Sequence, residues 1–211
     1  MTGWRWRSVV PERRYAVCLA VALAAVVVIL GPALGPGLTL AYDLGWSPDP
    51  RFTPFVTGAG MVAPRAVPSD AAGVLLGMLV GARLAQKLVL ALVLLAAALG
   101  PVALLRTLRP AIGATALSAT ALAGVWNPFV AERLAIGQWT ILLGYGLTGF
   151  ALAAVVRWHR REAGVLPLLA WIAVAGVGGA NPLVMLLPPL LVALAWPGRR
   201  VQERAAALAA V

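Results

Sequence analysis

The chain has 211 residues, of which 62% are hydrophobic and 11% are charged, and its mean hydropathy is +0.92. Soluble domains carry about 25% charged residues, so this composition excludes an ordinary soluble domain. The net charge of +10 lies in short basic clusters between apolar segments, which indicates membrane topology and argues against a nucleic-acid partner.

Residues 1–14 form a basic segment, and Tyr15–Leu34 supplies the first apolar run. About 20 apolar residues are needed to cross about 30 Å of hydrocarbon, so this run predicts a membrane span. Ala33, Leu34 and Gly35 also resemble a signal-peptide cleavage site, but the run is longer than a usual signal core, which favours an anchor. Because the basic segment precedes the span, we expect a cytoplasmic N-terminus at the plasma membrane.

Residues 35–87 are expected to form one long external loop, since they are rich in Pro and Gly. The loop holds all three aspartates of the chain, Asp43, Asp49 and Asp70. Ala71–Ala82 is too short for a span, so we expect a helix along the outer surface. Ser69 or Asp70 would cap its start.

Three further spans are predicted, returning inward, outward and inward in turn: Leu88–Leu105, Ala111–Val130 and Ile136–Val156. The last apolar stretch, Ala163–Trp196, is too long for one span. It is broken by glycines and by Asn181-Pro182, so we expect a helical hairpin.

The sequence therefore predicts an all-α, polytopic transmembrane bundle of about six spans, with a transmembrane domain over 15–196 and a cytoplasmic tail over 197–211. The basic clusters after the second, fourth and last predicted spans would then all lie on the cytoplasmic side.

Candidate site residues gather on the predicted outer side. Asp43 lies a few residues past the first span, at the rim of any cavity between the helices, where partial desolvation would suit it to act as a base. The alternative is a solvated loop or turn carboxylate. Asp49, within Ser-Pro-Asp-Pro, is typical of a turn.

A second polar segment, 126–139, contains Glu132, Arg133 and Gln138 between aromatic residues. Charged groups near membrane depth are costly and often functional. An interfacial turn with hydrated charges is the alternative interpretation. The outer basic residues could bind phosphate of a lipid carrier, or each could be a snorkelling side chain: Arg51, Arg65, Arg83, Lys87 and Arg133.

No nucleotide-binding loop, zinc-protease motif, Cys-x-x-Cys or hydrolase Ser motif occurs in the sequence. The segments that carry a family resemblance are 38–43 (LTLAYD), 48–54 (PDPRFTP), 63–70 (APRAVPSD) and 126–134 (WNPFVAERL). Together they resemble the N-terminal part of actinobacterial polytopic glycosyltransferases of the GT-C class.

The resemblance implies an outer-face enzyme that takes a sugar from a polyprenyl-phosphate donor and gives it to a cell-envelope glycan or lipid. Asp43 would deprotonate the acceptor hydroxyl or orient a divalent metal, and Glu132 would be a secondary acid. The residues implied in substrate binding are Asp49, Arg51, Arg65, Lys87, Arg133 and Gln138. The sequence itself contains no metal-ligand motif.

Members of that class usually have more spans and often a C-terminal domain, so the chain is expected to be either an active enzyme or a fragment of one. The sequence also allows two other functions: a non-catalytic membrane subunit, and a transporter or flippase of a lipid-linked substrate. No charged residue lies at the centre of a predicted span, which gives a transporter little support.

Overall fold

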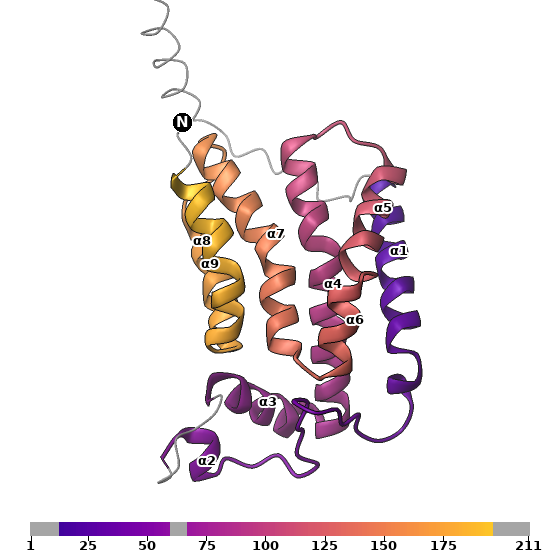
Figure 1. Cartoon of the computed structure of the whole chain (residues 1–211), viewed down its shortest axis with the longest axis vertical. Helices are drawn as coiled ribbons and strands as arrows, with labels where there is room; N and C mark the ends of the chain where they lie inside the picture. The colour runs from indigo at the N-terminus through magenta and orange to yellow at the C-terminus, as the bar shows by residue number, and fades with distance from the viewer. Residues whose placement is uncertain (1–12, 60–66, 196–211) are drawn as a thin grey trace, which may run out of the picture.

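The computed structural model describes residues 13–59 and 67–195. Apart from an isolated bridge between Ala41 and Leu44, the regular elements in these two stretches are helices (Figure 1). They are α1 (Arg13–Leu30), the 3-10 turn η1 (Gly31–Leu34), α2 (Pro54–Thr57), α3 (Val67–Val80), α4 (Ala82–Leu108), α5 (Ala114–Val125), α6 (Pro128–Ala135), α7 (Trp139–His159), α8 (Leu166–Val177) and α9 (Ala180–Ala195). The predicted all-α class is therefore confirmed.

The long helices stand side by side as a bundle, with α4 and α7 at its centre (Figure 1). Helices α1 and α5 pack on one side of this pair, and α8 and α9 pack on the other. The core is apolar: Leu94 of α4, Leu117 of α5 and Leu142 of α7 are fully buried. Because helices from separate parts of the chain pack side by side, residues far apart in the sequence meet at each end of the bundle.

Glycines allow α4 and α7 to approach closely. A Cβ added to Gly149 would overlap the backbone of Gly100, and one added to Gly100 would overlap the carbonyl of Gly146. Small residues at helix contacts let two backbones pack against each other, which is a common way to associate helices in membranes. The central contact therefore depends on the absence of side chains at these positions.

Within residues 13–59 and 67–195, three helical segments are long and apolar enough to cross a membrane, judged by length and composition: Arg13–Leu34, Ala82–Leu108 and Trp139–His159. They coincide with three of the predicted spans. The predicted hairpin is also present as α8 and α9, of 12 and 16 residues, joined at Gly178 and at Gly179, whose φ is 82°. These two helices are shorter than a usual span.

The structure differs from the predicted span over Ala111–Val130, because the chain forms two helices there. Asn127 separates α5 from α6: its Oδ1 accepts a hydrogen bond from the Val130 N–H at 3.0 Å, and its Nδ2 donates to the Ala123 carbonyl at 2.9 Å. The side chain thus caps the new helix and occupies a carbonyl at the end of the old one. Pro128 follows at the first position of α6, where it suits a helix start.

A helix is present where one was predicted over Ala71–Ala82: it is α3, which runs from Val67 to Val80 and lies across the end of the bundle (Figure 1). Its position on the outer surface of a membrane stays a prediction. Ser69 and Asp70 fall inside its first turn, so neither precedes the helix as a cap would. Helix α4 already begins at Ala82, after Gly81 with φ 86°. The end of the predicted loop, residues 83–87, is therefore helical.

Candidate functional site

The segment that carries Asp43 forms a tight turn docked on the connection between α6 and α7. The Leu44 N–H donates to the Ala41 carbonyl at 2.5 Å, and the Asp43 N–H donates to the Ile136 carbonyl at 3.0 Å. Leu44 is only 3% exposed and joins the core beneath the turn. The backbone of Asp43 is thus held by a residue that follows it by more than ninety positions.

Gly137 makes this docking possible. Its φ is 77°, a conformation that glycine adopts at little cost. A Cβ at this position would overlap both the Ala41 carbonyl oxygen and the Leu44 nitrogen. The turn at 41–44 can therefore lie directly on the α6–α7 connection only because residue 137 has no side chain.

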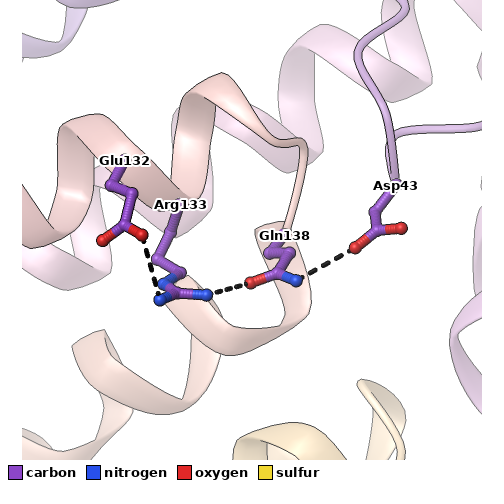
Figure 2. Close-up of polar contacts among 4 residues, drawn as sticks. All are labelled: Asp43, Glu132, Arg133 and Gln138. Carbon is purple, nitrogen blue, oxygen red and sulfur yellow. Dashed lines mark hydrogen bonds and ion pairs between the residues drawn. The ribbon is translucent and has the colours of Figure 1, made fainter.

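A chain of polar contacts links Asp43 to α6 (Figure 2). Gln138 Nε2 donates to Asp43 Oδ2 at 3.0 Å, and Arg133 Nη1 donates to Gln138 Oε1 at 2.6 Å. Arg133 Nη2 also pairs with Glu132 Oε1 at 3.3 Å. Because a guanidinium can only donate, Arg133 determines the orientation of the Gln138 amide and directs its NH₂ group to Asp43.

Beside this turn lies a cavity of about 640 Å³, bounded by the external loop, α3 and the N-terminal ends of α7 and α9. Small-molecule sites usually measure about 300–1,000 Å³. The polar side chains on its wall include Asp43, Asp70, Gln138 and Asn181, and the aromatic ones are Trp46, Phe55 and Trp139. This mixture can hold a ligand that has both apolar faces and hydroxyl groups.

The start of the external loop is fixed to α4. The Gln86 side chain is 1% exposed, and it accepts from the Thr39 N–H at 2.8 Å and donates to the Thr39 carbonyl at 2.7 Å. Lys87 Nζ donates to the carbonyls of Leu34 and Gly35. These contacts satisfy backbone groups that no regular element satisfies, and they hold the chain between α1 and Asp43 in place.

The sequence did not single out Gln86, although a glutamine near the start of a long apolar helix was a visible signal. Asp70 was interpreted as a cap and Asn181 as part of a turn, and neither Trp46 nor Trp139 was assigned to a site. Their common place on the cavity wall depends on the packing of α3, α7 and α9, which no local pattern reveals.

Of the predicted site residues, Asp43 and Gln138 lie on the cavity wall. Arg133 does not line the cavity, but it donates a hydrogen bond to Gln138. Glu132 is exposed and contacts Arg133, and it does not line the cavity. Asp43 is also exposed, so it lacks the partial desolvation that the sequence argument assumed.

Three other predicted binding residues, Asp49, Arg51 and Lys87, do not line the cavity. Asp49 and Arg51 form an ion pair at 2.8 Å, with both side chains more than 60% exposed. The Lys87 ammonium donates its hydrogen bonds to the carbonyls of Leu34 and Gly35. Arg65 lies outside the described residues. The binding roles of these side chains stay predictions.

A divalent metal would need several carboxylate, imidazole or thiolate ligands together. Within residues 13–59 and 67–195, no three His, Cys, Asp or Glu side chains are grouped in such an arrangement. The described residues therefore do not fit a metal held by protein ligands alone.

No known protein family matches the chain, and neither the curated proteins nor the solved structures include a match.

Proposed function

We propose that the protein is a membrane-embedded glycosyltransferase, or a module of one, that moves a sugar from a polyprenyl-phosphate donor to a glycan or lipid acceptor at the outer face of the plasma membrane. The observation that carries the proposal is the Asp43 carboxylate on the wall of a ligand-sized cavity that is lined by aromatic and polar side chains.

The lining suits a sugar. Trp46 and Trp139 offer flat apolar surfaces against which the C–H face of a pyranose or furanose ring can pack. Gln138 and Asn181 can each donate to and accept from hydroxyl groups. Gln138 is already bonded to Asp43 and Arg133, but it keeps one N–H and one oxygen lone pair, and no described residue bonds the Asn181 amide. These groups favour a hydroxylated ligand over a wholly apolar one.

In the proposed reaction, Asp43 is the general base. Its Oδ2 accepts from Gln138, whereas Oδ1 has no hydrogen-bond partner among the described residues. Oδ1 takes the proton of the acceptor hydroxyl while that oxygen forms a bond to the anomeric carbon. The bond from this carbon to the phosphate oxygen breaks, its electron pair leaves with the lipid phosphate, and the anomeric configuration inverts.

The leaving phosphate needs a cation to stabilise its charge. Arg133 is already bound to Gln138 and Glu132. Arg51 follows Pro50, a residue of the cavity wall, and its ion pair with Asp49 is exposed and therefore weak. We assign the phosphate contact to Arg51, because its weak pair with Asp49 leaves the guanidinium able to turn toward a phosphate.

The membrane placement in this proposal has six passes. Helices α1, α4 and α7 cross fully, α5 with α6 makes a broken pass, and α8 and α9 form the last hairpin. With a cytoplasmic N-terminus, the cavity opens at the outer face. Helix α3 would rest on the outer leaflet, because Leu75, Met78 and Leu79 are 52%, 59% and 73% exposed.

The test is sugar transfer from a radiolabelled polyprenyl-phosphate sugar in membranes that contain this chain. We expect Asp43→Asn to lower the rate by about 100-fold or more, the usual contribution of a positioned general base. Glu162→Gln is the matched control, because Glu162 is exposed in the connection between α7 and α8, at the other end of the bundle.

Two outcomes would contradict the proposal. Unchanged transfer by Asp43→Asn would remove this carboxylate from the mechanism. No transfer by the inserted wild-type chain, with every donor tried, would favour a non-catalytic subunit or a transporter.

A further inference from the structure

A second cavity, of about 260 Å³, lies at the end of the bundle opposite Asp43. Four helices form its wall: α1 contributes Tyr15, α4 contributes Arg106, α7 contributes Arg157 and α8 contributes Trp171. The sugar-transfer chemistry proposed above uses none of these residues. Sugar transfer at Asp43 therefore does not account for this cavity.

Among the described residues, the rim of this cavity carries two arginines and no carboxylate. Arg106 places its guanidinium over the Tyr15 ring, 4.5 Å from the centroid, and the described residues offer its N–H groups no hydrogen bond. The Arg157 side chain is exposed and likewise has no ion pair or hydrogen bond within 13–59 and 67–195. Two cationic groups thus line one cavity, and no described residue accepts a hydrogen bond from either.

Neighbouring arginines at this end behave differently. Arg14 Nη1 donates to the Ile112 carbonyl at 3.0 Å, and Arg160 Nη1 donates to the Thr107 carbonyl at 2.6 Å. Those two side chains satisfy backbone carbonyls next to helix ends, which is a structural role. Arg106 and Arg157 have no such acceptor among the described residues, so their N–H groups can donate to a bound anion.

The floor of the cavity is apolar. Phe150 and Trp171 stack there with ring centroids 4.8 Å apart, and Ala103, Ala153 and Ala154 complete the surface. Arg106 lies in the last turn of α4, the longest helix able to cross a membrane, so the rim falls at headgroup depth and the floor falls toward the hydrocarbon.

We infer that this cavity binds the headgroup of an anionic phospholipid, with the phosphate on Arg106 and Arg157 and an acyl chain against Phe150 and Trp171. Basic cavities between helices on the cytoplasmic side are suited to such lipids. The inference rests on the membrane placement and not on sugar transfer.

The test measures lipid retention by the full chain in detergent, using native mass spectrometry with added phosphatidylglycerol or phosphatidylcholine. A basic side chain near a lipid surface contributes about fivefold in affinity. We therefore expect Arg157→Gln to weaken phosphatidylglycerol binding about fivefold and the double variant with Arg106→Gln to weaken it about thirtyfold. Arg109→Gln, at the same end but off the cavity wall, should leave the affinity unchanged.

Arg157→Gln removes no hydrogen bond or ion pair within the described residues. This variant should therefore fold normally, and it keeps the test decisive even if Arg106→Gln does not fold. Equal losses in Arg157→Gln and Arg109→Gln would overturn the inference, because they would indicate a general surface-charge effect. Equal retention of phosphatidylcholine, or full displacement by equimolar inorganic phosphate, would also overturn the assignment to an anionic lipid. Each of these results is distinct from a failure of sugar transfer.

Discussion

Gly137→Ala should release the turn that carries Asp43. The substitution places a methyl group against the Ala41 carbonyl oxygen and the Leu44 nitrogen, and it forces alanine into a φ of 77°. The left-handed conformation costs about 1 kcal/mol for a residue with a Cβ. Overpacking against backbone atoms adds about 1–3 kcal/mol, so the docked turn should lose about 2–4 kcal/mol in total.

Hydrogen exchange measures this loss locally. The amides of Asp43 and Leu44 are hydrogen-bonded only while the turn is docked or closed, so their exchange reports its opening. A loss of about 2–4 kcal/mol corresponds to exchange about 30- to 900-fold faster. The measurement uses peptides that cover residues 41–46 of the detergent-solubilised chain.

Gly179→Ala is the matched control, because Gly179 has a φ of 82° but no atom lies within 4 Å of the place that a Cβ would take there. It carries the same backbone strain without the overlap, and it lies in the α8–α9 connection. If Gly137→Ala exchanged at 41–46 no faster than Gly179→Ala, the turn would not depend on the contact with residue 137, and the reasoning would be refuted.

Three other substitutions test the framework around the site. Gln86→Leu should leave the Thr39 N–H and carbonyl unpaired and cost about 2–3 kcal/mol, seen as a lower midpoint of thermal unfolding in detergent; Gln86→Glu, which keeps the acceptor, should lose less. Asn127→Ala should cost about 1–2 kcal/mol in the same assay, whereas Asn127→Asp, which retains the cap of α6, should recover part of it. Gly149→Leu should destabilise the α4–α7 contact by about 3 kcal/mol or more, while Gly176→Leu on open α8 surface should change little. Equal midpoints within any of these pairs would contradict the corresponding contact.

The lengths of apolar runs were enough to predict the long helices. Tyr15–Leu34, Leu88–Leu105 and Ile136–Val156 correspond to the three segments able to cross a membrane, and the glycines near 178 correctly marked the hairpin between α8 and α9. The length and hydropathy of an apolar run are local properties of the sequence, so no tertiary information was needed to predict these helices. Asn127-Pro128 was also a local signal for a helix start, but the apolar run around it concealed the break.

The sites were decided by tertiary structure. Asp43 and Gln138 were both candidates, yet their contact joins residues 95 positions apart and requires a glycine at 137 that permits the close approach. Arg106 and Arg157 were interpreted only as topology signals until the packing of α4 against α7 brought them to one cavity. The sequence by itself determined that the chain is helical and suited to a membrane, because hydrophobic length suffices for that. Which polar groups meet depended on close contacts between backbones, and these are made by residues without side chains, which carry little signal in a sequence pattern.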